Sequence, residues 1–396
     1  MLTKAFIPYQ GYYCSPFARW QGSFANEHSI LLGSQTARNW LGAKKISPEI
    51  FDYLILGATV GQPHLFYGGP WASALMGAEN IPGMLISQAC STATTVIFQA
   101  AMGVETGLYQ NVFTLMTDRC SNGPHTIWPN PQGPGGQVIS ENWVMDQFNN
   151  DPWAKNPMIQ TAENVARQAG ITREECDSLA LRRAEQYADS LAFDRKFQKR
   201  YMFPVTINLS RKKTIQVETD EGIMPTTREG LERLKPVLPE GAHTFGSQTH
   251  PADGNCGLIV TTKERAAQLS SDPSKDARVI SYGFSRAQKG FMAMAVVPAA
   301  RMALERAGIS MDEVTVIKTH NPFAANDIYL ARQMKIDVNQ FNNFGSSLVF
   351  GHPQAPTAGR LIIEGVEELV DKGGGYLLFT GCAAGDTGAA LVVRIG

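Results

Sequence analysis

Charged residues are scarce in this chain. They make up 18% of its 396 residues, and 35 Lys and Arg balance 36 Asp and Glu. No excess of positive charge is therefore available to attract nucleic acid or an anionic membrane. The chain also lacks both a run of roughly 18 apolar residues and the charged-then-apolar start of a signal peptide. We therefore expect a cytoplasmic protein without nucleic-acid or membrane partners.

Cysteine is scarce as well. The six cysteines form no Cys-x-x-Cys pair and lie far apart, at positions 14, 90, 120, 176, 256 and 382. Disulfide scaffolds and structural zinc sites both need clustered ligands. The sequence therefore predicts reduced thiols, no disulfide framework and no metal site.

Apolar residues, at 43%, are abundant enough for a large core, and the length exceeds what one core usually holds. Apolar runs such as 53–56 and 375–379 alternate with helical-period stretches such as 179–192 and 296–307. This alternation is typical of βαβ units, so it predicts an α/β fold with two packed units.

A weak internal repeat supports two similar halves. Residues 37–38 (Ala-Arg) match 300–301 at an offset of 263, and residues 103–105 (Gly-Val-Glu) match 365–367 at an offset of 262. The same spacing places Cys90 opposite His352, and Asp118 opposite Cys382. We therefore predict that candidate chemical groups occupy matching ends of matching elements.

Four segments follow from the repeat. The stretch at 129–136 is rich in Pro and Gly, and a charged helical pattern follows it. We predict a first half at 1–120, an inserted loop domain at 121–250, a return to the first half at 251–275 and a second half at 276–396.

Cys90 is the first candidate for chemistry. It follows a short apolar strand and begins an apolar helix that runs to about Met102. The unpaired N–H groups at a helix N-terminus lower the pKa of a thiol and favour a nucleophilic thiolate. The position alone favours a buried structural cysteine, and the remaining motifs reverse this preference.

Three further candidates come later in the chain. His352 lies in a Gly-His-Pro loop, where a neutral imidazole can take the Cys90 proton. His320 follows the apolar run 315–317, and Cys382 follows another strand in a loop of small residues that lets a ligand approach the backbone. Each motif alone is also compatible with an ordinary core or turn residue.

In chain order, the motifs Cys-x-Ser, His-Asn-Pro-Phe-Ala, Gly-His-Pro and Cys with a glycine loop resemble the four signature blocks of the thiolases. The resemblance covers nearly the whole chain, including 161–164, 220–222 and 253–254. It implies a thiolase fold, in which two duplicated βαβαβαββ-type halves form layers in the order α-β-α-β-α and carry an inserted loop domain.

The resemblance also implies roles for the candidate residues. Cys90 would be the acylated nucleophile, His352 its activator, and Cys382 the group that exchanges a proton with the α-carbon of the departing acyl-CoA. One oxyanion site would use His320 with His352. The other would use the backbone N–H groups of Cys90 and Ala384.

Coenzyme A would be a substrate, with no covalently bound cofactor. The resemblance implies that CoA lies between the loop domain and the catalytic pocket and contacts Thr249, Ser247 and Met158. The chain departs from most thiolases in having His320 where they have Asn, as sterol-carrier-type thiolases do. The segment 244–249 also differs from the usual pantetheine-supporting sequence.

The His-Asn-Pro-Phe form resembles the thiolase subunits of benzoylsuccinyl-CoA thiolases in anaerobic toluene degradation. This implies cleavage of 2-benzoylsuccinyl-CoA by CoA into benzoyl-CoA and succinyl-CoA. It also implies a homodimer core that binds a small zinc-binding, OB-fold partner subunit to give a heterotetramer. Aromatic residues that could accommodate a bulky acyl group are Phe66, Tyr67, Trp71, Trp128, Trp143 and Trp153.

Two alternatives stay open. One is an aliphatic 3-oxoacyl-CoA or acetoacetyl-CoA thiolase, which differs in the volume of the acyl pocket. The other is a non-catalytic acyl-CoA-binding subunit of a larger complex, against which the presence of both thiols and His352 argues. The sequence does not indicate whether the reaction runs toward cleavage or toward condensation.

Overall fold

The computed structural model describes residues 1–210 and 212–396. Its main sheet has 11 strands, in the order β13-β14-β15-β12-β1-β11-β6-β4-β5, with β2 and β3 paired to β11. β1 pairs with both β11 and β12 and so joins the sheets of the two halves. The predicted α/β fold is confirmed.

The N-terminal half contributes the parallel strands β4, β5 and β6, and β11 runs antiparallel to β6. In the C-terminal half β13 is parallel to β14, while β15 is antiparallel to β14 and β12. The strand bounds are β1 (Phe6–Ile7), β2 (Tyr12–Cys14), β3 (Ala18–Arg19), β4 (Tyr53–Gly57), β5 (Gly83–Ile86), β6 (Asn111–Arg119), β11 (Ala252–Thr261), β12 (Ala277–Arg286), β13 (Val314–His320), β14 (Gly375–Ala383) and β15 (Thr387–Ile395).

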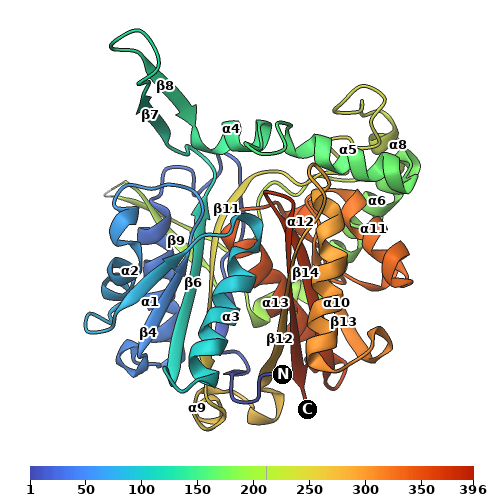
Figure 1. Ribbon diagram of the computed structural model, residues 1–396. Helices are drawn as coiled ribbons and strands as arrows, with labels where there is room; N and C mark the ends of the chain where they lie inside the picture. Colours follow the sequence, from blue (N-terminus) through green and yellow to red (C-terminus); the bar gives the residue numbers. More distant parts are fainter. Residues whose placement is uncertain (211) are drawn as a thin grey trace.

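Helices form three layers around these strands (Figure 1). α1 (Ser29–Lys44) and α2 (Gly68–Met76) cover the outer face of the N-terminal half, and α10 (Val296–Ala307) and α11 (Ala324–Met334) lie outside the C-terminal half. Between the halves, α3 (Thr92–Glu105) and α13 (Ala355–Asp371) pack against strands of both. The predicted α-β-α-β-α arrangement is therefore confirmed.

The central layer is tightly packed because α13 is buried from Ala355 to Leu369. Gly359 faces the sheet of the N-terminal half, where an added Cβ would lie 2.5 Å from Cys256 Sγ. A side chain at this position would push the helix away from the sheet. The small residues that precede it in the helix, Ala355 and Ala358, keep α13 close to both halves.

The internal repeat corresponds to equivalent elements. Residues 103–105 lie in α3 and 365–367 in α13, while 37–38 lie in α1 and 300–301 in α10. The halves differ after the second strand, because the counterpart of β5 is a short helix, α12 (Ser347–Phe350). That helix carries Ser347 to the end of β13, where it contacts His320.

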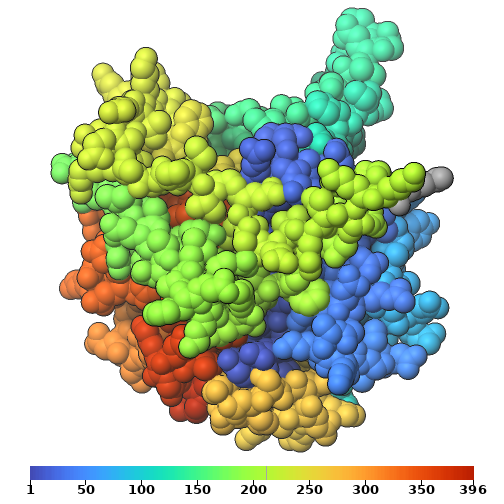
Figure 2. Space-filling view, turned by 180° about the vertical axis from the view of Figure 1, so that it is seen from behind, coloured from blue at the N-terminus to red at the C-terminus, as the bar shows by residue number. Residues whose placement is uncertain are grey.

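The segment between β6 and β11 adds elements outside the layers: β7 (His125–Pro129), β8 (Val138–Asn142), α4 (Trp143–Asn149), α5 (Met158–Ala169), α6 (Arg173–Ser190), α7 (Ala192–Arg195), β9 (Val205–Ser210), β10 (Lys213–Val217) and α8 (Arg228–Glu232). The β7–β8 hairpin projects from the body in Figure 1. In Figure 2 the green and yellow-green part of this segment spreads over the blue and red halves. The boundaries at 120, 250 and 275 stay a prediction.

Short elements complete the chain: α9 (Lys263–Leu269) and the 3₁₀ turns η1 (Pro48–Ile50), η2 (Leu65–Tyr67), η3 (Ala89–Ser91), η4 (Gln198–Arg200), η5 (Pro273–Lys275), η6 (Met292–Ala295), η7 (Met311–Glu313) and η8 (Val338–Gln340). Among the helices that the structure describes, none is long and apolar enough to cross a lipid bilayer.

Candidate active site

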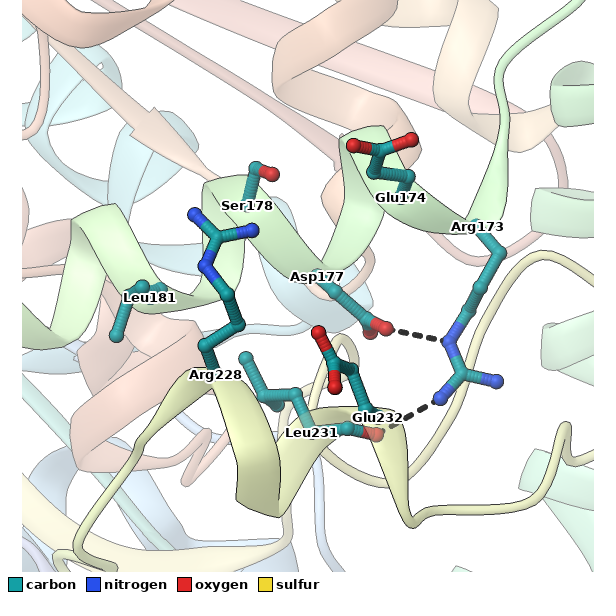
Figure 3. Close-up of a pocket in the computed structure, with 8 residues that line it drawn as sticks. All are labelled: Arg173, Glu174, Asp177, Ser178, Leu181, Arg228, Leu231 and Glu232. Atoms are coloured by element: carbon teal, nitrogen blue, oxygen red, sulfur yellow. Dashed lines mark hydrogen bonds and ion pairs between the residues drawn. The ribbon is translucent and has the colours of Figure 1, made fainter.

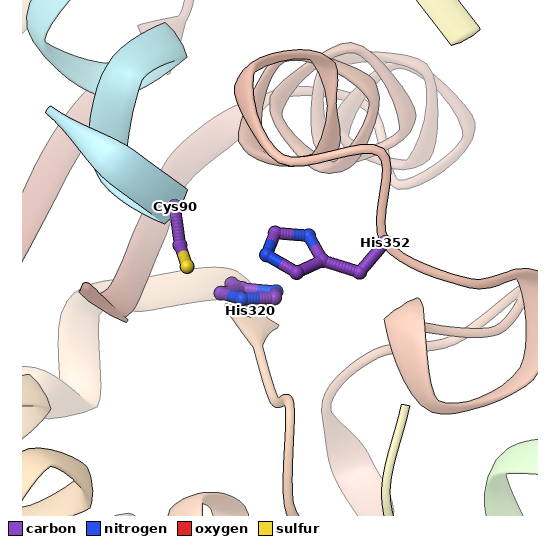
Figure 4. A group of neighbouring side chains, drawn as sticks. All are labelled: Cys90, His320 and His352. Carbon is purple, nitrogen blue, oxygen red and sulfur yellow. The ribbon is translucent and has the colours of Figure 1, made fainter. Parts of the chain in front are cut away.

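Three of the predicted residues meet between the halves (Figure 4). Cys90 lies in η3 just before α3, His320 ends β13, and His352 lies in the loop between α12 and α13. One sulfur or ring-nitrogen atom from each lies within 4.8 Å of the others, and the two imidazole centroids are 4.2 Å apart. Duplication explains the meeting, because Cys90 and His352 precede the two equivalent central helices.

His352 is held by its backbone and by one ring nitrogen. Its N–H donates to the His250 carbonyl at 2.8 Å, and its Nδ1 lies 2.6 Å from Thr357 Oγ1. The preceding Gly351 has φ +85°, and an added Cβ would lie 2.7 Å from His250 Cε1. Only glycine fits there without strain. The Nε2 atom is buried and has no hydrogen-bond partner among the described residues.

His320 is arranged in the same way. Its Nδ1 lies 3.0 Å from Ser347 Oγ, which is also 3.0 Å from Asn321 Oδ1. Its Nε2 is buried and lacks a partner among the residues described. Burial lowers the pKa of His320 to about 3, and burial together with the neighbouring His320 lowers the pKa of His352 well below its ordinary value. Both imidazoles are therefore neutral.

The Cys90 thiol donates to Gln354 Oε1 at an Sγ···O distance of 3.4 Å. Burial raises the pKa of Cys90 to about 12, although the backbone N–H groups of Ala384 and of Cys90 itself act to lower it. The expectation of a thiol pKa lowered by the helix N-terminus is therefore wrong for the free protein. Desolvation of the thiolate outweighs the favourable N–H groups, so the resting thiol is neutral.

Cys382 lies near the end of β14 and is fully buried. Asn326, in the first turn of α11, donates its Nδ2–H to Cys382 Sγ at 3.1 Å. Burial and the nearby Cys90 raise the pKa of Cys382 well above its ordinary value, and the Asn326 hydrogen bond opposes them. The backbone N–H of Ala384, just after β14, interacts with the Cys90 thiol. The end of β14 and the loop that follows it therefore contribute to the surroundings of both thiols.

Asp118, the counterpart of Cys382 in the repeat, has a structural role. Its carboxylate accepts the N–H groups of Thr59, Val60 and Ala355, each at 2.9 Å. Burial raises the pKa of Asp118 to about 7. The residue ties the loop after β4 to the start of α13, directly after Gln354, and so fixes the loop that carries His352.

The residues predicted to contact CoA lie at different depths. Thr249 Oγ1 donates to the Ser347 carbonyl at 2.5 Å, beside the His320 site. Met158, at the start of α5, packs against an apolar cluster that includes Phe323 and Cys382. Ser247 is fully buried and accepts the Thr244 N–H at 2.9 Å, so its hydroxyl is turned away from solvent. All three contacts stay predictions.

Several candidate aromatic residues do not enclose an acyl group. Phe66 is 91% exposed, Trp128 48% and Trp153 60%. The ring of Trp143 instead donates its N–H to the Thr59 carbonyl at 3.1 Å. In the described structure Phe66, Trp128 and Trp153 are too exposed to line a buried pocket, and which residues accommodate a bulky acyl group stays a prediction.

A surface pocket lies elsewhere, between α6 and α8 (Figure 3). Arg173 in this pocket pairs with Asp177 at 2.5 Å and donates to the Leu231 carbonyl at 2.8 Å. Among its lining residues, two arginines face three carboxylates, namely Arg173, Arg228, Glu174, Asp177 and Glu232. This charge balance disfavours a phosphate, so we assign no ligand to the pocket.

Sequence reasoning missed four residues that support the site: Gln354, Asn326, Ser347 and Thr357. Three of them, Ser347, Gln354 and Thr357, lie within five positions of His352, and their polar side chains next to a Gly-His-Pro loop are a signal that could have been used. Asn326 follows His320 by six positions, on a helix whose direction only the structure gives. No pattern in the sequence connects it with Cys382.

Fold and site together define an α/β enzyme of two duplicated halves, with a cysteine and two histidines at their junction. Comparison with known families agrees. The thiolase N-terminal domain matches residues 12–264, and the thiolase C-terminal domain matches residues 274–395. The chain belongs to the thiolase family, whose members are acyltransferases.

Individual relatives match over almost their whole length. The human mitochondrial 3-ketoacyl-CoA thiolase is 26% identical over 389 residues, covering 96% of each chain. The Escherichia coli acetyl-CoA acetyltransferase is 27% identical, covering 94% of this chain and 95% of its own. The crystal structure of the human mitochondrial enzyme has a TM-score of 0.91 at 24% identity and covers 99% of both chains, which shows the shared fold.

Proposed function

We propose that this chain is a 3-oxoacyl-CoA thiolase that works through an acyl group on Cys90. One observation carries the proposal: a thiol faces two neutral imidazoles whose Nε2 atoms have no other partner in the described structure. Such atoms are free to receive the thiol proton and to donate to a substrate oxygen. The names of the relatives, 3-ketoacyl-CoA thiolase and acetyl-CoA acetyltransferase, support the same reaction class.

In the first step the Cys90 proton moves to His352 Nε2 while the sulfur attacks the 3-oxo carbon. Thr357 Oγ1 supports this role when it accepts the Nδ1–H of His352, because Nε2 then carries the lone pair. The resting thiol is neutral, so the proton leaves as the C–S bond forms. His320 donates to the developing oxyanion in its Nε2–H tautomer, which requires the Ser347 hydroxyl to turn its proton from Asn321 Oδ1 to His320 Nδ1.

In the second step the oxyanion collapses and the bond between C2 and C3 breaks. Its electron pair goes to the departing acyl-CoA as an enolate, and Cys382 supplies the proton to its α-carbon. Asn326 holds the Cys382 sulfur and stabilises the thiolate that remains. Two thiols in different surroundings can thus perform two different tasks.

In the third step the thiol of CoA gives its proton to the Cys382 thiolate and attacks the carbonyl carbon of acyl-Cys90, and the Cys90 sulfur leaves and regains its proton from His352. The backbone N–H groups of Cys90 and Ala384 stabilise the thioester oxygen. CoA acts as a substrate and would approach past Thr249, Ser247 and Met158. Thr249 has the strongest structural support because it contacts the backbone of Ser347, which holds His320.

The finer substrate assignment is 2-benzoylsuccinyl-CoA, cleaved to benzoyl-CoA and succinyl-CoA in toluene degradation. Its support is the His-Asn-Pro-Phe form around His320. The names of the relatives favour the aliphatic alternative, a 3-oxoacyl-CoA or acetoacetyl-CoA thiolase. The two readings differ in which acyl group Cys90 accepts, so they can be separated by experiment.

A homodimer is part of the proposal. β5 ends the sheet and pairs only with β4 among the described strands, which leaves its outer edge for a second copy. Leu85 on this strand is 38% exposed, and the strand leads directly to the loop that carries Cys90. A small zinc-binding OB-fold subunit and a cytoplasmic location stay predictions that rest on the sequence.

Intact-mass and peptide analysis tests the proposal. The wild-type protein and Cys90→Ser are incubated separately with benzoyl-CoA, acetyl-CoA and succinyl-CoA, with any co-encoded partner added. A benzoyl adduct on Cys90 supports the benzoylsuccinyl-CoA assignment, and an acetyl adduct alone supports the aliphatic alternative. An absence of adducts in every case, with the partner present, would favour a non-catalytic subunit and rule out the proposed reaction.

A further inference from the structure

Cys90, His320 and His352 have the composition of a metal site. Within the described part of the chain they are the one group of three or more Cys, His, Asp or Glu residues whose ligand atoms gather closely enough, within 4.8 Å of one another. Cysteine spacing could not reveal this group, because its members come from three distant segments. A thiolate with two imidazoles suits Zn²⁺, which prefers sulfur and nitrogen ligands.

The two ring nitrogens that would bind the ion are buried and have no other partner among the described residues. They are His320 Nε2 and His352 Nε2, on side chains that are at least nine-tenths buried. An unpaired buried polar atom destabilises the folded protein. A cation between these atoms would satisfy both.

The opposite ring nitrogens are held as they are in known zinc sites, where the second nitrogen of a ligating histidine is fixed by a hydrogen bond. Ser347 Oγ lies 3.0 Å from His320 Nδ1, and Thr357 Oγ1 lies 2.6 Å from His352 Nδ1. Each hydroxyl can accept the Nδ1–H, which leaves the Nε2 lone pair for a metal. Both rings are thus preorganised as ligands.

We propose that Cys90 Sγ, His320 Nε2 and His352 Nε2 bind one Zn²⁺ ion and that the bound ion blocks acylation of Cys90. The sulfur gives up its proton as the bond to zinc forms, so one proton is released and the imidazoles, which are neutral, release none. Three protein ligands leave a fourth tetrahedral position for water or for Gln354 Oε1, which already contacts the sulfur.

The geometry needs only a small adjustment. Zn–S and Zn–N bonds of about 2.3 and 2.0 Å place tetrahedral ligand atoms roughly 3.3–3.6 Å apart. Because the ligand atoms lie within 4.8 Å of one another, they need to close by at most about 1.5 Å, through small rotations of the Cys90 and histidine side chains.

The test measures zinc binding to chelator-treated protein without substrate, by competition with a chromogenic zinc indicator. Cobalt(II) serves as the spectroscopic probe, because a cobalt–thiolate bond gives a charge-transfer band. We expect one zinc ion per chain. Zinc should bind roughly 100-fold more weakly to His320→Asn and Cys90→Ser, because losing a ligand costs at least as much affinity as losing a hydrogen bond that supports one. Ser347→Ala should weaken binding about 10-fold. The cobalt charge-transfer band should be absent in Cys90→Ser.

The matched control is Cys176→Ser. Cys176 Sγ lies 3.9 Å from His243 Nε2, so this variant removes a thiol–imidazole contact elsewhere in the chain. It should bind zinc like the wild type. Wild-type affinity in His320→Asn, equal loss in Cys176→Ser, or no saturable binding of one ion would overturn the proposal.

A second measurement needs no variant. Zinc should protect Cys90 of the wild-type protein from alkylation, read by peptide mass, and undiminished labelling of Cys90 at saturating zinc contradicts the site. Neither readout requires acyl transfer. The failure of the zinc site is therefore distinguishable from failure of the proposed reaction, which is judged by the acyl adduct formed without zinc.

Discussion

Replacing Asn326 with Ala tests how the second thiol is tuned. In the structure the Asn326 Nδ2–H donates to Cys382 Sγ at 3.1 Å, and both residues are buried. A donor stabilises the thiolate more than the thiol, so this hydrogen bond lowers the pKa of Cys382 against the opposing effect of burial. Its removal therefore raises that pKa further.

The size of the effect follows from the charge on the acceptor. A hydrogen bond to a charged group contributes about 1.5–3 kcal/mol. At about 1.4 kcal/mol per pKa unit, its loss raises the pKa of Cys382 by about 1–2 units. The thiolate population at a fixed pH then falls about 10- to 100-fold, and proton exchange at the α-carbon of an acyl-CoA should slow by the same factor.

The assay follows deuterium uptake into the α-position of acetyl-CoA in heavy water, with acylation of Cys90 measured in parallel by intact mass. Exchange should slow in Asn326→Ala while acylation changes little, because Asn326 donates to Cys382 and not to Cys90. Raising the pH by about 1–2 units should restore exchange, since the thiolate population recovers. Thermal unfolding of the variant checks that the fold persists.

Two results would refute this reasoning. Exchange at the wild-type rate would show that the Asn326 hydrogen bond does not affect proton transfer by Cys382. An equal loss of exchange and acylation that a higher pH does not restore would show a structural defect instead of a changed pKa.

Three further predictions concern stability and the first thiol. Below pH ~6.5 the unfolded chain takes up a proton at His320 and the folded chain does not. The free energy of unfolding, measured in urea, should therefore fall as the pH drops from ~6.5 to ~5. In His320→Asn the dependence of this free energy on pH should be weaker by about 1.4 kcal/mol per pH unit. Gly359→Ala should cost about 1–3 kcal/mol of stability, because its Cβ would push α13 away from Cys256, whereas Gly42→Ala, with open space around it, should leave the unfolding temperature unchanged. Thr357→Val removes the hydroxyl at His352 Nδ1 and should slow Cys90 acylation at least about 10-fold, as measured by stopped-time intact mass.

Much of the fold could be predicted from the chain because it is encoded locally and then repeated. Alternating strand and helix patterns indicated the α/β class, and the repeat placed Cys90 and His352 before equivalent helices. The structure has α3 and α13 side by side at the centre, with both residues at their N-terminal ends. The order of four short motifs was enough to suggest the family, which the domain matches then showed.

The exception within the repeat shows the limit of this reasoning. The counterpart of β5 is the helix α12, although the offset alone would give a strand there. Its Ser347 reaches His320, a contact that depends on how α12 packs against the end of β13 and not on any spacing along the chain. Tertiary packing therefore overrode the duplicated pattern at the point where the site needed a hydroxyl.

The sequence by itself determined which chemical groups the protein has and which halves carry them. Only the tertiary structure decided their state. Position at a helix N-terminus predicted a lowered pKa for Cys90, but burial raises it to about 12. Desolvation depends on every neighbour that displaces water, and those neighbours come from segments up to hundreds of residues apart. The same packing brought Gln354 to one thiol and Asn326 to the other.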